Sequence, residues 1–304
     1  MDYKELIQKA FSYASSLEGK GELASYIPEL KNVDPNKFGV YIATNKGFNF
    51  GLGDYKDTFS IQSISKVLSL SLAYKTVGED IWKRVDVEPS GNPFNSLLQL
   101  ENDNGIPRNP FINAGAIVIS DILLSNLENP KEDFLKFVRG LSEDCEIDYS
   151  AKVAKSEKET GFRNFALCNF LKSLGNIENN PEDVLDFYFD LCSLTTNSKG
   201  LANLFLLFAN QGKTLPNNLE ILTKNQSKRI NAIMQTCGFY DESGEFAFRV
   251  GLAGKSGVSG AIVAIHPDEY AIVSWSPKLN KKGNSYKGFM FLEEFTTLTE
   301  DSIF

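Results

Sequence analysis

The sequence contains few of the residues that build metal centres and disulfide frameworks. Its 304 residues include one histidine, His266, and four cysteines, Cys145, Cys168, Cys192 and Cys237, none in a C-x-x-C pair. A single histidine cannot supply a histidine-rich metal cluster, and widely spaced cysteines do not indicate zinc or redox chemistry. We therefore expect no metal site, and we interpret each cysteine as a small buried hydrophobic residue.

Positive charge and long apolar segments are also scarce. The formal net charge is −8 and no basic cluster is present, which argues against a nucleic-acid partner because that binding depends on residues that neutralise phosphates. The apolar run at 201–209 stops well before the roughly 20 residues that cross a bilayer, so we expect no membrane span. Residues 1–7 are charged and lack the apolar core of a secretory signal, which predicts a cytoplasmic protein.

The composition is otherwise that of an ordinary globular protein, with 42% hydrophobic and 23% charged residues. No Pro/Gly/Ser-rich linker, low-complexity run or internal repeat divides the chain. We therefore expect residues 1–304 to form a single unit.

Strand-like segments lie near both ends of the chain. Residues 38–44 and 48–52 flank a short turn that contains a glycine, which predicts a β-hairpin. Three further runs, at 246–250, 260–265 and 270–275, predict antiparallel strands.

The middle of the chain carries helical patterns instead. Helices are predicted at 121–126, 130–141, 163–173, 181–191 and 199–211. Residues 67–74 alternate like a strand but also fit a buried helix. If the first and last strands share one antiparallel sheet, the fold is α+β. Residues 1–62 and 240–304 then form a sheet subdomain, and 63–239 form a mainly helical subdomain inserted between them.

Ser63-Ile64-Ser65-Lys66 places a hydroxyl and an amine three residues apart, on one face of a helix. A serine is a good nucleophile only if a base removes its proton, and a lysine acts as that base only when its pKa is lowered. Ser65 is a competing serine, but a helix would point its side chain away from that of its neighbour Lys66.

Gly254-Lys255-Ser256-Gly257 supplies a second lysine at the start of a strand-like segment. A K-[ST]-G strand accompanies S-x-x-K in the penicillin-recognising enzymes. If Lys255 lies near Lys66, its charge and burial are both expected to lower the pKa of Lys66. The alternative is that Lys255 is a solvated charge at the end of a strand.

With these two motifs in place, longer stretches from Tyr26 onward resemble the serine-dependent glutaminase family of the bacterial glutaminase A type. The matching segments are 26–30, 62–66, 88–91, 113–117, 156–161, 163–166, 185–189, 237–241, 254–260 and 275–277. The resemblance implies a serine β-lactamase/penicillin-binding-protein-like fold. It also implies hydrolysis of L-glutamine to L-glutamate and ammonia through a glutamyl-enzyme ester, without a metal or organic cofactor, by a homo-oligomer, either a dimer or a tetramer.

The resemblance also implies roles for individual residues. Ser63 matches the nucleophile and Lys66 its base, while Tyr26 and Tyr240 match tyrosines that relay protons to the departing ammonia. The oxyanion hole would consist of the backbone N–H groups of Ser63 and Val258.

A polar pocket for the amino-acid end of glutamine is implied in the same way. Glu157 would pair with the substrate ammonium. Gln62, Asn113, Asn164 and Tyr188 would complete the pocket, with amide and hydroxyl groups for the carboxylate and the side chain.

Each of these residues also has a simpler interpretation. Tyr188 fits an aromatic core, Asn113 a helix cap and Asn164 a turn. Glu157 and Glu159 fit a solvated charged face.

Two further features of the sequence are not expected to take part in catalysis. His266 fits a turn between strands, and no G-x-S-x-G motif accompanies it. The S-x-N element at 90–92 lies in a turn-like stretch and is interpreted as a chance match.

Two other functions use the same features. A β-lactamase, penicillin-binding protein or esterase would direct the same serine and lysine to another acyl group. A non-catalytic amino-acid sensor would keep the fold and bind glutamine without turnover.

Overall fold

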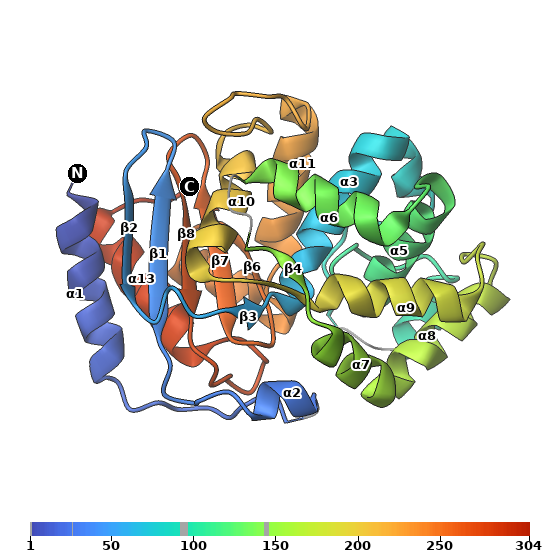
Figure 1. Cartoon of the computed structure of the whole chain (residues 1–304), viewed down its shortest axis with the longest axis horizontal. Helices are drawn as coiled ribbons and strands as arrows, with labels where there is room; N and C mark the ends of the chain where they lie inside the picture. Colours follow the sequence, from blue (N-terminus) through green and yellow to red (C-terminus); the bar gives the residue numbers. More distant parts are fainter. Residues whose placement is uncertain (1, 26, 92–96, 143–145) are drawn as a thin grey trace.

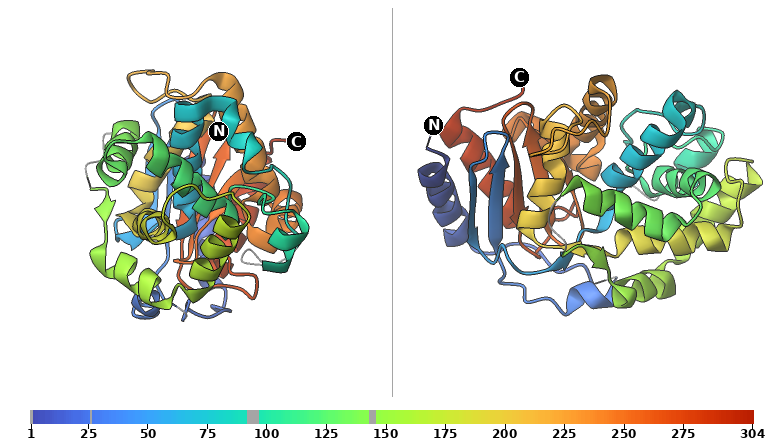
Figure 2. Two further views of the ribbon diagram at one scale, coloured as in Figure 1. Left: turned by 90° about the vertical axis from the view of Figure 1, so that its right-hand side faces the viewer. Right: turned by 45° about the horizontal axis from the view of Figure 1, so that its top comes forward.

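A computed structural model describes residues 2–25, 27–91, 97–142 and 146–304. A sheet covered by helices forms one side of the molecule, and a group of helices forms the other (Figure 1). The right-hand view in Figure 2 shows the same two parts side by side. No helix within the described ranges is long and apolar enough to span a membrane.

The first and last strands share one five-stranded antiparallel sheet, as the sequence predicted. The strand order is β2-β1-β8-β7-β6. The strands are β1 (Gly39–Thr44), β2 (Asn49–Gly53), β6 (Ala253–Ser256), β7 (Ala261–His266) and β8 (Tyr270–Trp275). The hairpin predicted around Gly47 is confirmed as the β1–β2 pair.

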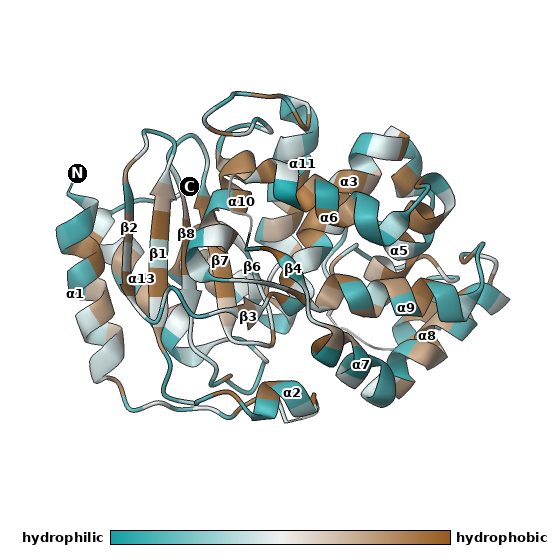
Figure 3. Ribbon diagram, in the orientation of Figure 1, coloured by the Kyte–Doolittle hydropathy of each residue, from teal (hydrophilic) through white to brown (hydrophobic). Residues whose placement is uncertain are grey.

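Both faces of this sheet are buried, because alternate side chains enter two different cores. Val40 and Ile42 of β1 join the core beneath α1 (Tyr3–Ser16) and α13 (Tyr286–Thr299). Tyr41 and Ala43 join the larger core, which also contains α10 (Ser198–Ala209). Hydrophobic residues accordingly concentrate on the strands and on α10 (Figure 3).

The remaining helices include α3, which follows the predicted nucleophile and packs against α5, α6, α9 and α11. These helices are α3 (Ser65–Val77), α4 (Leu97–Asn102), α5 (Asn113–Asn126), α6 (Pro130–Leu141), α7 (Ala151–Thr160), α8 (Phe162–Ser173), α9 (Pro181–Cys192) and α11 (Lys224–Cys237). Shorter elements are α2 (Pro28–Lys31) and the 3-10 helices η1 (Gln62–Ile64), η2 (Gly78–Lys83) and η3 (Tyr240–Glu242). A small sheet joins β3 (Phe59–Ser60), β5 (Leu194–Thr196) and β4 (Asp148–Tyr149).

Two segments show where hydrophobic periodicity fails. The run 246–250 was expected to be a strand, but residues up to 249 belong to helix α12 (Ser243–Arg249), and the third C-terminal strand is β6. In a strand, Phe246 and Phe248 would lie on the same face, but Phe246 is buried whereas Phe248 is 90% exposed. The ambiguous run 67–74 is helical and buried on all sides, which removes the 3.6-residue pattern.

The division into subdomains at 62 and 240 stays a prediction. Helix α10, from the central segment, packs against β1, β7 and β8, so the two parts share the larger core.

Gly238 is expected to be essential for joining α11 to β6. A Cβ built at Gly238 would lie 1.9 Å from the Gly254 carbonyl oxygen and 2.4 Å from that of Met234. We expect Gly238→Ala to lower the free energy of unfolding by about 2 kcal/mol, because backbone must move to relieve the overlap. Denaturant unfolding measures this.

Gly244→Ala is the matched control, since Gly244 lies in a helix with no atom within 4 Å of an added Cβ. That substitution should leave stability unchanged or raise it by up to about 1 kcal/mol. Equal stability changes in the two variants would contradict the packing argument.

Candidate active site

The turn that presents Ser63 is tightly constrained. The chain passes from β3 through η1 into α3, and Gln62 has a φ of +50°, in the left-handed region. Such a conformation costs on the order of 1–3 kcal/mol for a residue other than glycine. Ser63 is partly exposed while its neighbours Gln62 and Ile64 are buried. Ser65 donates its hydroxyl hydrogen to the Gln62 carbonyl at 2.8 Å, so it braces the turn.

Lys66 is buried and surrounded by oxygen acceptors. Its Nζ donates to Asn113 Oδ1 at 2.7 Å and to the Phe111 carbonyl at 3.3 Å. Asn113 donates in turn to Asn164 Oδ1 at 2.9 Å, so these two predicted residues are connected to the base. Burial lowers the pKa of Lys66 to about 8, although electrostatic interactions with Cys192 and Glu157 act to raise it.

Asn113 is therefore not a helix cap. It is the first residue of α5, where Ile112 holds the cap position, and its side chain is directed to Lys66 and Asn164.

Lys255 is fully buried on β6, which rules out the solvated alternative. Its Nζ donates to the Ser256 carbonyl at 2.6 Å and lies 4.5 Å from the centre of the Tyr240 ring. Burial, followed by the charge of Lys66, lowers the pKa of Lys255 well below its usual value. The expected lowering of the Lys66 pKa by burial is confirmed. The charge of Lys255 is not among the causes of that shift, whereas the charge of Lys66 does lower the pKa of Lys255.

Tyr240 lies between the two predicted catalytic motifs. It has a φ of +55° at the start of η3, and its hydroxyl is buried. Burial raises the pKa of Tyr240 to about 12, against the opposing effect of hydrogen bonding to Ser63 and Ser256. The phenol is therefore protonated at neutral pH and lies at the Ser63 hydroxyl.

Glu157 and Glu159, which the sequence left open, differ sharply in environment. Glu157 is 8% exposed, and burial raises its pKa to about 7, opposed by the charge of Lys66 and a hydrogen bond with Gln62. The Glu159 side chain is 64% exposed and pairs with Lys155 at the surface. Only Glu157 faces the site.

Tyr188 and Cys192 lie one turn apart on α9 and form a hydrogen bond. Burial raises the pKa of both groups, to about 12 for the Cys192 thiol, and the charge of Glu157 contributes to each shift. Tyr188 thus belongs to the cluster, while Cys192 is a member that the sequence analysis missed. The i, i+4 spacing of Cys192 from Tyr188 was the available signal.

Val258 is brought to the nucleophile by a close backbone contact. A Cβ at Gly257 would lie 2.6 Å from the Ile61 carbonyl oxygen, so only glycine allows this approach. Val258 packs against Tyr240 in a small cluster that includes Ala24 and Ile27.

Tyr26 and Asn92 lie outside the described residues. His266 lies apart from the cluster: its Nδ1 is 3.0 Å from the Pro267 carbonyl oxygen and its Nε2 is 3.3 Å from that of Ser302. Within the described ranges, no three His, Cys, Asp or Glu side chains converge as metal ligands.

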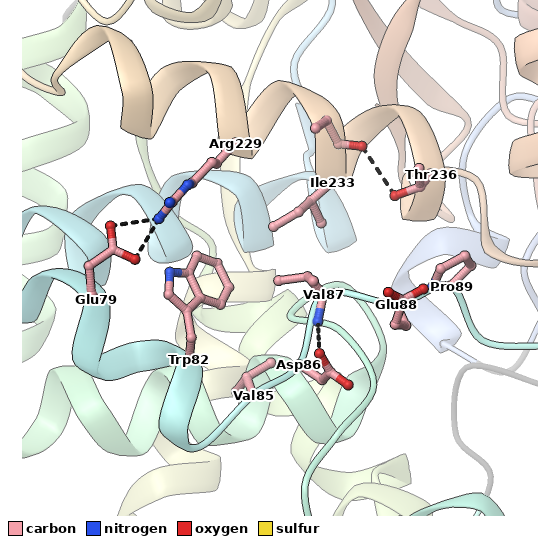
Figure 4. Close-up of a pocket in the computed structure, with 11 residues that line it drawn as sticks. Glu79, Trp82, Val85, Asp86, Val87, Glu88, Pro89, Arg229, Ile233 and Thr236 are labelled. Atoms are coloured by element: carbon pink, nitrogen blue, oxygen red, sulfur yellow. Dashed lines mark hydrogen bonds and ion pairs between the residues drawn. The ribbon is translucent and has the colours of Figure 1, made fainter.

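A separate cavity of about 560 Å³ lies between η2 and α11 (Figure 4). Trp82, Val85 and Ile233 line it, and Arg229 pairs with Glu79 at one end. None of the predicted site residues that the structure describes borders this cavity.

The cluster contains the groups that acyl transfer from an amide requires. It combines a serine hydroxyl, an amine of lowered pKa, a protonated phenol at the serine and a buried carboxylate. Asn113, Asn164 and Gln62 add neutral hydrogen-bonding groups.

Comparisons with known proteins are consistent throughout. The Glutaminase family model matches residues 21–304. Curated glutaminases of Christiangramia forsetii and Saccharophagus degradans are each 54% identical over 304 residues, which covers all of this chain and 100% and 99% of theirs. The solved structure of the probable glutaminase ybaS has a TM-score of 0.94 at 33% identity, with 99% of this chain and 98% of that one covered.

Another solved structure of a relative was determined with a glutamine analogue. The probable glutaminase from Bacillus subtilis complexed with 6-diazo-5-oxo-L-norleucine has a TM-score of 0.86 at 31% identity. The match covers 99% of this chain and 94% of that one.

We expect the Lys66 amine to titrate near pH 8 and to do so independently of Lys255. Because burial dominates the pKa of Lys66, Lys255→Met should leave that titration in place. Lys66→Met, in contrast, should raise the pKa of Lys255 by removing a neighbouring positive charge. NMR of protein labelled at lysine Cε measures both; an upward shift of Lys66 in the Lys255→Met variant would contradict this assignment.

Proposed function

Because this chain belongs to the glutaminase family, we propose that Ser63 attacks the side-chain amide of L-glutamine and forms a glutamyl ester. The chain is an amidohydrolase of glutamine with the serine β-lactamase-like fold of that family. The observation that carries the mechanism is the placement of the Ser63 hydroxyl against Tyr240, one helical turn from a buried lysine whose pKa is about 8.

In the first half-reaction, the neutral amine of Lys66 takes the proton of the Ser63 hydroxyl as the oxygen attacks the amide carbon. Negative charge develops on the carbonyl oxygen. The backbone N–H groups of Ser63 and Val258 stabilise it, since the Gly257 contact brings the two segments together.

Ammonia leaves when its nitrogen gains a proton. The protonated Tyr240 phenol donates it and recovers a proton from Lys66, so the C–N bond breaks and both groups return to their starting states. Tyr26 is the second candidate for this relay. Water then attacks the ester, with Lys66 again as base, and releases glutamate and Ser63.

Substrate recognition uses the polar side of the cluster. Glu157 binds the ammonium of glutamine, and ionises more readily when that positive charge arrives. Asn113, Asn164, Gln62 and Tyr188 provide the remaining hydrogen bonds. Analogues without the ammonium or amide leave these buried groups unpaired and are rejected.

The same family membership supports two proposals on its state in the cell. We propose that the chain acts in the cytoplasm as a homo-oligomer, either a dimer or a tetramer. Light scattering at several concentrations measures the mass, and a monomer at all of them would contradict the second proposal.

Ser63→Ala should reduce kcat by at least about 10³-fold, because no other group replaces the nucleophile. Ammonia release from L-glutamine measures this. Ser65→Ala is the control: Ser65 only braces the preceding turn, so most activity should remain.

Covalent labelling identifies the attacking atom directly. 6-Diazo-5-oxo-L-norleucine should add one adduct to the wild-type chain, at Ser63, and none to the Ser63→Ala variant. Retained turnover or labelling of Ser63→Ala would exclude the proposed nucleophile.

Glu157→Gln should raise KM for glutamine by roughly 10- to 100-fold, since a neutral amide cannot pair with the substrate ammonium. Glu159→Gln, on the exposed side of the same helix, should leave KM unchanged. Steady-state kinetics of the two variants measure the difference; similar KM values would remove Glu157 from the proposed binding site.

A further inference from the structure

Glu242 is a buried carboxylate two residues from Tyr240, and neutral amides hold it. It is 6% exposed and accepts hydrogen bonds from Asn280 Nδ2, at 3.0 and 2.9 Å, and from Asn284 Nδ2. The salt bridges among the described residues do not include Glu242. Burying a carboxylate is costly unless hydrogen bonds compensate, and the two asparagine amides provide that compensation.

The two asparagines belong to a loop that is closed on itself. Asn280 Oδ1 accepts from the backbone N–H groups of Lys282 and Asn284, at 2.9 and 3.1 Å. The Asn280 N–H donates to the Asn284 carbonyl at 2.7 Å. The loop therefore presents its amide donors to Glu242 in a fixed arrangement.

The network binds the chain on both sides of Tyr240. Glu242 follows Tyr240 in η3, and the Phe239 carbonyl before it accepts from Asn284 Nδ2 at 3.3 Å. Tyr240 itself has the left-handed φ of +55°. A bulky residue keeps that conformation only when its surroundings enforce it.

The same loop reaches the opposite side of the site. Leu279 packs in the cluster that contains Val258 and contacts Tyr240. The Ser276 N–H donates to the Gly260 carbonyl at 3.0 Å, close to the turn that carries Val258. One loop therefore connects the proton-relay tyrosine to the segment proposed for the oxyanion hole.

We propose that Glu242, Asn280 and Asn284 are positioning residues that hold the Tyr240 hydroxyl against Ser63. This inference rests on the proposed function, in which Tyr240 delivers the proton to departing ammonia. None of the three touches the nucleophile, so their effect passes through Tyr240. Loss of the network should lower kcat with little change in KM.

Glu242→Gln is the first test. The substitution keeps size but turns one acceptor into an N–H donor that opposes the asparagine amides. We expect kcat to fall about 10-fold while KM changes less than about 3-fold. Asn280→Asp is a second, independent variant: it places a carboxylate against Glu242 and should lower kcat in the same way.

The double variant E242Q/N280D exchanges donor and acceptor, so the hydrogen bond between positions 242 and 280 is restored with reversed polarity. Oδ1 at position 280 can still accept from the two backbone N–H groups. We expect kcat to return to within about 3-fold of wild type, a recovery that general destabilisation would not produce.

A double-mutant cycle with Tyr240→Phe tests the route of the effect. If Glu242 acts through the phenol hydroxyl, Glu242→Gln should cause no further loss of kcat once that hydroxyl is absent. An equal fold loss in both backgrounds, or an unchanged kcat in Glu242→Gln and Asn280→Asp, would overturn the proposal.

Asp121→Asn is the matched control, because Asp121 is also a buried carboxylate held by an asparagine, Asn179, together with Arg84. It lies away from Tyr240 and should lower stability without the kcat-specific loss. Different results would contradict the proposed function itself: no hydrolysis of glutamine by the wild-type chain, or hydrolysis retained in Ser63→Ala.

Discussion

The arrangement of the site depends on the burial of two lysines in one cluster. Burial disfavours the charged form of each amine. Because two positive charges also repel, the state in which Lys66 and Lys255 are both protonated is disfavoured further. The structure resolves this by unequal solvation. Lys66 has the Asn113 side chain, the Phe111 carbonyl and the charge of Glu157, whereas Lys255 has the Ser256 carbonyl and the face of Tyr240. Of the two amines, Lys66 therefore keeps its proton to the higher pH, and it becomes the neutral base beside the serine above its pKa of about 8.

The two lysines come from different parts of the fold. Lys66 comes from the first turn of a helix and Lys255 from an edge strand of the sheet, so neither part of the molecule can build the pair alone. Two residues of the site, Gln62 and Tyr240, have a strained backbone with φ in the left-handed region. Rigid packing is what holds such conformations, and it brings a serine, an amine and a phenol together.

Local patterns in the sequence predicted much of the fold but less of the electrostatics. The hairpin and the helix at 130–141 were predicted closely, because a glycine-containing turn joins the two strands and Pro130 marks the first turn of the helix. The run at 246–250 failed, since aromatic residues two apart suit a strand as well as a helix with one buried side. The motifs identified the site residues. They could not say which lysine lowers the pKa of the other, or whether Glu157 or Glu159 faces the site, because both depend on burial. Burial is a property of the assembled core, which no single segment specifies.

The linkage of Glu157 to Lys66 gives the proposed mechanism a dependence on substrate. In the free protein, the negative charge of Glu157 raises the pKa of Lys66 and so opposes formation of the neutral base. The ammonium of bound glutamine offsets that charge. The pKa of Lys66 then falls toward the value that burial alone would set, and its proton is released more readily when an amide is in place for attack. A carboxylate that recognises the amino-acid end of the substrate thereby also prepares the base at its other end.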